Sequence, residues 1–106
     1  MAYNIDYETL KNELDLEKDE VDMLVEIFLN TAEDELSNLE DAIEKLNFDQ
    51  IAKSAHAIKG SSANLRLMYI SETAKSIELA AKEKRKIDYK KNYQTLKESI
   101  EKIKIT

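Results

Sequence analysis

The sequence predicts an all-α fold, namely an up-and-down antiparallel four-helix bundle with a short extra N-terminal helix. The chain of 106 residues contains no proline and a single glycine, whereas turn-rich β folds need these residues at their corners. Apolar residues recur at steps of three and four over long stretches, which is the period of an amphipathic helix. The segments between these stretches are short, so we expect consecutive helices to lie antiparallel.

The first two helices follow from this apolar spacing. A short helix is predicted at about residues 6–14, and a long one at about residues 19–46. The long stretch carries one continuous apolar stripe, which consists of Val21, Leu24, Val25, Phe28, Ala32, Leu36, Leu39, Ile43 and Leu46. A stripe of this kind packs one side of the helix against a core.

The third helix is predicted at about residues 48–66, and its start carries a local signal. Asn47 and Gln50 have the spacing of a capping box, in which each side chain bonds to the backbone of the other residue. Leu46 and Ile51 have the spacing of a hydrophobic staple.

The last two helices are predicted at about residues 70–85 and 88–104. Ser71 is a candidate N-cap for the first of them. The inward positions of the two helices are Ile70, Ala74, Ile77 and Ala81, followed by Tyr89, Tyr93, Leu96, Ile100 and Ile103.

The composition restricts the class of protein. Residues 1–106 have the length of one domain, and the absence of cysteine excludes disulfides, thiolate zinc sites and cysteine nucleophiles. No apolar run approaches the roughly 18 residues that span a bilayer, and the N-terminus lacks the regions of a signal peptide. We therefore expect a cytoplasmic protein without a membrane partner. Burial of the apolar stripes within one bundle would suit a monomer.

The charge is unevenly distributed along the chain. Residues 1–50 carry 16 acids and 3 bases, while residues 51–106 carry 6 acids and 13 bases. We expect the acidic helices to pair with the basic ones inside one bundle. The basic run at residues 82–86 is short, has no interleaved aromatic residues and belongs to an acidic protein, so no nucleic-acid partner is expected.

The only histidine, His56, and the only glycine, Gly60, lie one helical turn apart in the third predicted helix. On a helical wheel, the buried face opposite His56 consists of Ile51, Ile58, Ser62, Leu65 and Tyr69. His56 is therefore expected to point to solvent. The small and apolar residues expected around it are Ala52, Gly60, Ala63 and Leu67. Two lysines, Lys53 and Lys59, lie at the edges of this group. Such residues in water around one histidine predict a docking surface for a partner.

Gly60 supports this interpretation. Glycine inside a helix is less favourable than alanine by about 1 kcal/mol. Because Gly60 is expected on the exposed side, the fold gains nothing obvious from it. A side chain at this position would instead stand in the path of an incoming partner.

The chemistry that these residues support is phosphoryl transfer to an imidazole. A neutral imidazole is nucleophilic at pH 7, and phosphoryl transfer depends chiefly on positioning and charge stabilisation. Lys59 can offset the charge on the phosphoryl oxygens. No acid lies within one helical turn of His56, so a Ser-His-Asp arrangement has no local support. One histidine without cysteine is a poor metal site, and a single glycine excludes glycine-rich phosphate loops, so no metal or cofactor is expected.

The stretch from His56 to Leu65 resembles the signature of histidine-containing phosphotransfer (HPt) domains, through His56, Ile58, Lys59, Gly60, Ser62 and Leu65. The resemblance implies that His56 is the phosphorylated residue. It also implies a response-regulator receiver domain or a hybrid histidine kinase as partner, with the aspartate and Mg²⁺ supplied by the receiver. It implies no ATP-dependent kinase activity of the chain itself. The family commonly has glycine at the position of Arg66, which here would either extend the helix or add a positive rim to the receiver contact.

Three interpretations remain open at this point. The first is a phosphotransfer module that relays a phosphoryl group between receiver aspartates, or from a hybrid kinase to a response regulator, through phosphohistidine. The second is a helical binding module that docks on a receiver or kinase domain without carrying phosphate. The third is the phospho-accepting domain of a chemotaxis-type histidine kinase, separated from its catalytic parts.

Overall fold

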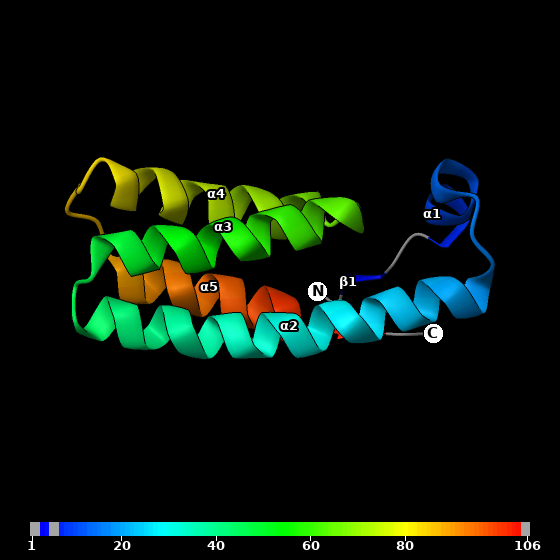
Figure 1. Cartoon of the computed structure of the whole chain (residues 1–106), viewed down its shortest axis with the longest axis horizontal. Coiled ribbons are helices and arrows are strands. Elements are labelled where there is room, and N and C mark those ends of the chain that lie inside the picture. The colour runs from blue at the N-terminus through cyan, green and yellow to red at the C-terminus, as the bar shows by residue number, and fades with distance from the viewer. Residues whose placement is uncertain (1–2, 5–6, 105–106) are drawn as a thin grey trace.

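The computed structural model describes residues 3–4 and 7–104, which form a rod of 42 × 21 × 21 Å (Figure 1). Its helices are α1 (Tyr7–Leu14), α2 (Lys18–Glu44), α3 (Phe48–Asn64), α4 (Met68–Lys82) and α5 (Tyr89–Glu101). Two short strands, β1 (Tyr3–Asn4) and β2 (Ile103–Lys104), complete the described elements.

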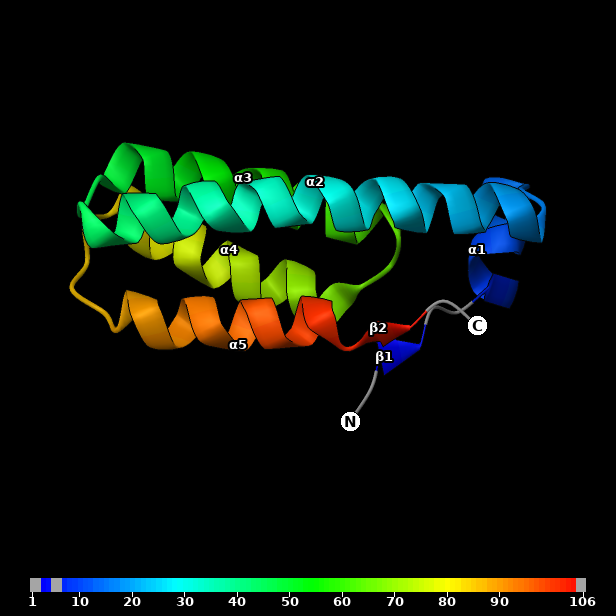
Figure 2. The same ribbon diagram turned by 90° about the horizontal axis from the view of Figure 1, so that it is seen from below.

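The prediction of an antiparallel four-helix bundle is confirmed. Helices α2 to α5 run alternately up and down the long axis, and the short α1 lies at the far end of α2 (Figures 1 and 2). The predicted stripe of α2 is buried, apart from Leu24 near its start and Leu46 beyond its end. The core therefore lies along the common axis of the bundle, and α3 and α4 make the closest pair of neighbours.

The start of α3 agrees with only half of the predicted capping box. The Asn47 side chain accepts a hydrogen bond from the Gln50 backbone N–H at 3.2 Å. The Gln50 side chain does not bond back to Asn47, because it donates to the Ser54 hydroxyl at 3.0 Å instead. Leu46 is 60% exposed, so the staple with the buried Ile51 does not form. The Asn47 side chain thus satisfies one of the free N–H groups in the first turn of α3.

The end of α3 lies at Asn64, two residues before the predicted end. Arg66 adopts a left-handed backbone with a φ of 60°. Its N–H donates to the Ala63 carbonyl and the Leu67 N–H donates to the Ser62 carbonyl, both at 3.0 Å, which is the Schellman pattern of a helix end. The expectation that Arg66 extends the helix is therefore wrong, since Arg66 occupies the conformation for which glycine is favoured.

This turn changes which of the side chains after Arg66 are buried. Leu67 is buried, because the residue that follows a Schellman turn packs back on the helix. Tyr69, predicted on the buried face, belongs to α4 and is 51% exposed. Ser71 is not the N-cap of α4, since Leu67 holds that position. The buried Ser71 hydroxyl instead donates to the Lys59 carbonyl at 3.1 Å, which joins α4 to α3.

The two ends of the described chain meet at the strands. Strand β1 pairs in parallel with β2, so Tyr3 lies opposite Ile103. Helix α5 therefore ends at Glu101, earlier than the predicted residue 104, because Ile103 belongs to this pair. Residue 6, the predicted start of the first helix, lies outside the described residues.

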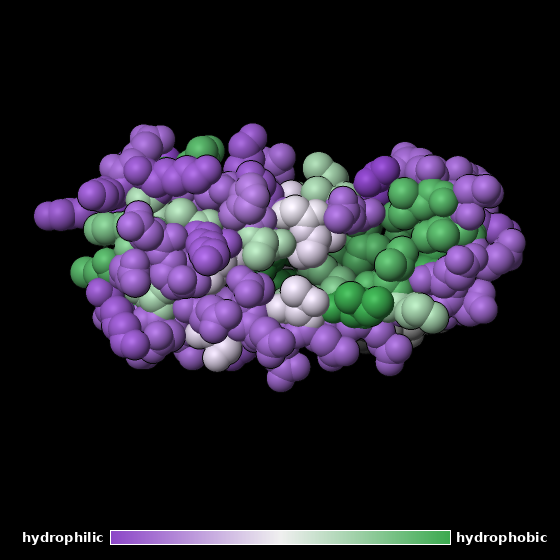
Figure 3. Space-filling view, in the orientation of Figure 1, coloured by the Kyte–Doolittle hydropathy of each residue, from purple (hydrophilic) through white to green (hydrophobic). Residues whose placement is uncertain are grey.

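The N-terminal turns of α2 extend beyond the other bundle helices and are covered mainly by α1 (Figure 2). A groove of about 490 Å³ remains there, and its apolar lining includes Leu14, Leu24 and Ile27. Figure 3 shows apolar side chains gathered over this end of the molecule. Hydrophilic residues cover most of the remaining surface in this view.

Candidate functional site

His56 lies in the middle of α3, and 65% of its side chain is exposed. The structure therefore places the imidazole in solvent, as the helical spacing predicts. The neighbouring Ile51, Ile58 and Ser62 are buried on the opposite face. The Ser62 hydroxyl donates to the Ile58 carbonyl at 2.6 Å, so its polar group is satisfied inside the bundle.

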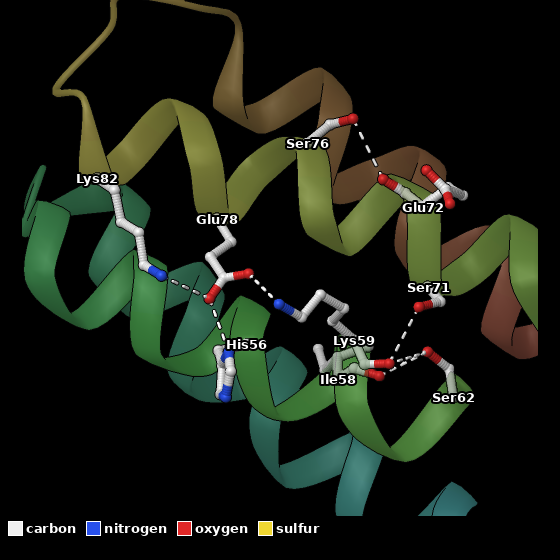
Figure 4. A network of polar contacts seen from close by, with 9 residues as sticks. All are labelled: His56, Ile58, Lys59, Ser62, Ser71, Glu72, Ser76, Glu78 and Lys82. Atoms are coloured by element: carbon white, nitrogen blue, oxygen red, sulfur yellow. Dashed lines mark hydrogen bonds and ion pairs between the residues drawn. The ribbon is translucent and has the colours of Figure 1, made fainter. Parts of the chain in front are cut away.

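The residue that orients the ring is Glu78 of α4, which sequence analysis missed. One carboxylate oxygen, Oε2, lies 2.7 Å from His56 Nδ1, and the other, Oε1, accepts from Lys59 Nζ at 2.7 Å (Figure 4). Lys82 Nζ lies 3.2 Å from Oε2. The Glu78 side chain is only 2% exposed, so these three contacts are made by a carboxylate held between α3 and α4.

Glu78 is ionised at neutral pH. Burial alone raises the pKa of its carboxyl group, but hydrogen bonds from Lys59, His56 and Lys82 outweigh that effect and lower the pKa to about 2. An ionised carboxylate only accepts hydrogen bonds. His56 Nδ1 must therefore carry the proton of this contact, and in the neutral ring Nε2 keeps its lone pair. Nε2 is the ring nitrogen that faces away from Glu78 (Figure 4).

A signal for Glu78 is present in the sequence. The inward stripe of α4 predicted at Ala74, Ile77 and Ala81 has position 78 on the same side of the helix. A lone acid on an apolar stripe is a buried charge, and buried charges are paired. Its partners on α3 cannot be read from the spacing within α4, because they lie 19 and 22 residues away in the chain.

Two of the residues predicted to contact a partner are exposed, namely Lys53 and Gly60, and Ala63 is half-buried. The expected exposure is wrong for Ala52 and Leu67, which are 8% and 5% exposed. Ala52 lies on the side of α3 that faces α4, where it shares a depression with Glu78 and Lys82. Leu67 lies past the end of α3, so the wheel of that helix no longer applies to it.

Gly60 has no structural reason to be glycine. Its φ is not in the left-handed region, and a Cβ placed on it meets nothing within 4 Å. The fold would therefore accept a side chain at this position.

The described part of the chain holds no group of three or more His, Cys, Asp or Glu side chains that could bind a metal ion. No helix in that part is long and apolar enough to cross a membrane.

Comparison with family models matches residues 23–105 to the model described as the Hpt domain. This range begins within α2 and contains α3, α4 and α5, and so contains His56, Lys59 and Glu78. Neither a curated protein nor a solved structure matches the chain.

Proposed function

Because the chain belongs to the Hpt domain family of two-component phosphotransfer modules, we propose that His56 accepts a phosphoryl group and passes it on. The observation that carries this proposal is the protonation and exposure of the His56 ring. A buried carboxylate fixes the proton on Nδ1, and Nε2 is left as a nucleophile on an exposed helix face.

The transfer step follows from this arrangement. The Nε2 lone pair attacks the phosphorus of an aspartyl phosphate, the Nε2–P bond forms, and the P–O bond to the aspartate breaks. The aspartate leaves as a carboxylate, so no proton has to leave the ring. The ring becomes cationic with its proton still on Nδ1, and the Glu78 carboxylate at 2.7 Å offsets that charge. The reverse sequence returns the phosphoryl group to an aspartate.

We propose the receiver domain of a response regulator, or a hybrid histidine kinase, as the partner. Hpt domains work with such proteins, and the receiver would supply the aspartate and Mg²⁺ in a cytoplasmic relay. The contact surface consists of His56, Lys53, Gly60 and Ala63 on the accessible side of α3. Lys59 adds positive charge beside the ring, one turn along the helix.

The test is transfer of label from a phosphorylated receiver domain. The parent chain should acquire label that is acid-labile and base-stable, whereas His56→Gln should acquire none. Because His56 is mostly exposed and Lys59 and Lys82 still contact Glu78, the variant should keep its helical content. Equal labelling of parent and variant would exclude His56 as the acceptor. Tight binding of receivers without transfer to or from any of them would favour the binding module instead.

Gly60 provides a second prediction. Gly60→Gln should stabilise the helix by roughly 0.5 kcal/mol, because glutamine is the better helix former and meets no obstacle. Transfer from a receiver domain should nevertheless slow about tenfold or more, since the side chain stands on the docking surface. Labelling by phosphoramidate, a small phosphoryl donor, should not change. Slower labelling by both donors would show an effect on the ring rather than on docking.

A further inference from the structure

A depression of about 450 Å³ lies beside His56, and residues of both α3 and α4 line it. Its lining consists of Asp49, Ala52, Lys53, His56, Glu78 and Lys82. Ala52 contributes the smallest side chain of this lining. Two lysines, Lys53 and Lys82, therefore line the same depression as His56.

The cations around Glu78 are not held equally. Lys59 is 30% exposed and lies 2.7 Å from Oε1, so it is packed against the carboxylate. Lys82 is 59% exposed and lies 3.2 Å from Oε2, the oxygen that also contacts His56. Lys82 is thus the looser of the two lysines, and it shares its oxygen with the ring (Figure 4). An exposed lysine on a flexible stem can move to another anion at little cost.

The charged groups around the depression carry a net positive charge, which favours an anion. Glu78 contacts two lysines but compensates only one of them. Lys53 adds a third ammonium group, and Asp49 is the second carboxylate that borders the depression. Three ammonium groups against two carboxylates leave one positive charge before a phosphoryl group arrives. A phosphoryl group on Nε2 brings close to two negative charges.

We propose that this depression is a phosphoryl-binding pocket, in which Lys82 and Lys53 contact the phosphoryl oxygens of phosphohistidine. This inference rests on the proposed role of His56. When the Nε2–P bond forms, Lys82 exchanges its contact with Oε2 for a phosphoryl oxygen. Oε2 then serves the cationic ring alone, while Lys59 stays on Oε1 and keeps Glu78 in place. Lys82 lies on α4, so the sequence motif on α3 does not include this cation.

The experiment uses the whole chain, phosphoramidate as donor and the variants Lys82→Met, Lys53→Met and Lys82→Arg. Labelling should slow roughly tenfold in each Met variant, the loss expected for one charge-assisted contact, and Lys82→Arg should largely restore the rate. The ³¹P signal of phosphohistidine, followed against pH, should titrate at higher pH in the Met variants, because an adjacent ammonium favours the fully ionised phosphoryl group. Lys86→Met, in the exposed loop after α4, is the control with the same change of charge.

The outcomes separate the two proposals. Absence of label on His56 in the parent chain would overturn the proposed function, and the pocket with it. Normal labelling of both Met variants, with an unchanged ³¹P titration, would overturn the pocket alone. If Lys82→Met slows labelling but its ³¹P titration matches that of Lys86→Met, Lys82 acts only through Glu78 and does not touch the phosphoryl group, which also overturns the pocket.

Discussion

Glu78→Gln is expected to destabilise the bundle at neutral pH, by an amount that shrinks as the pH falls. The pKa of Glu78 is lowered from 4.5 to about 2 in the folded chain. A carboxyl group with a depressed pKa stabilises the fold fully above its unfolded pKa, and this contribution is lost as the pH falls from about 4.5 towards 2. The difference between parent and variant should therefore decrease by on the order of 3 kcal/mol across that range. Urea unfolding at pH 7, 5, 4 and 3 should show about 2 kcal/mol of this decrease, because pH 3 lies about 1.5 units below the unfolded pKa.

All other carboxyl groups occur in both chains, so their own titration cancels in the comparison. Asp41→Asn is a matched control, since Asp41 also accepts from a lysine four residues away, Lys45, at 3.0 Å. That pair is exposed, and exposed pairs contribute about 0–1 kcal/mol. Its effect on stability should stay small at every pH. A destabilisation by Glu78→Gln that is the same at pH 7 and pH 3 would show that the buried carboxylate is not stabilised by its three partners.

The helices were predictable from sequence because their stability depends on one repeated local pattern. The inward residues of α2 and α5 follow it over many turns, and burial agrees with it. The exposure of His56 was predictable for the same reason, since the opposite face of α3 is apolar. Direction around a helix is a local property.

Contacts between helices were not predictable in this way. Glu78 reaches His56 and Lys59 only because α3 and α4 pack closely, with the Ser71 hydroxyl on the Lys59 carbonyl. The periodicity of each helix predicts which face is buried. It does not predict which residues of the neighbouring helix contact that face. The burial of Ala52 was missed for the same reason. Half of the site comes from α4, so a motif on α3 describes only the other half.

The ends of α2, α3 and α4 were also missed, and these three ends share one feature. Leu46, Arg66 and Lys84 all have φ between 50° and 60°, and each follows a helix. The backbone N–H of the residue that follows each of them donates to the carbonyl five residues earlier. These bonds run from Asn47 to Ala42, from Leu67 to Ser62 and from Arg85 to Ala80. These are Schellman ends, where glycine is the usual residue. Without glycine as a marker, the sequence predicted α3 and α4 two to three residues too long.

Replacing these three residues by glycine is therefore expected to stabilise the bundle. An L-residue in the left-handed region is strained by roughly 1–2 kcal/mol per residue, and glycine loses part of this gain through its freedom in the unfolded chain. Leu46 is 60% exposed, so little packing is lost there. Arg66→Gly also removes the exposed pair with Glu13, which makes its gain the smallest. We expect about 2 kcal/mol for the triple variant, or a thermal midpoint about 10 °C higher.

Lys86→Gly tests whether the gain comes from backbone strain. Lys86 lies in the same exposed loop as Lys84, but its φ is not positive. Glycine there only adds freedom to the unfolded chain, so the midpoint should stay level or fall. A triple variant no more stable than the parent would mean that the left-handed turns carry no strain. His56 should accept label equally well in the triple variant, because none of the three residues lines the depression beside the ring.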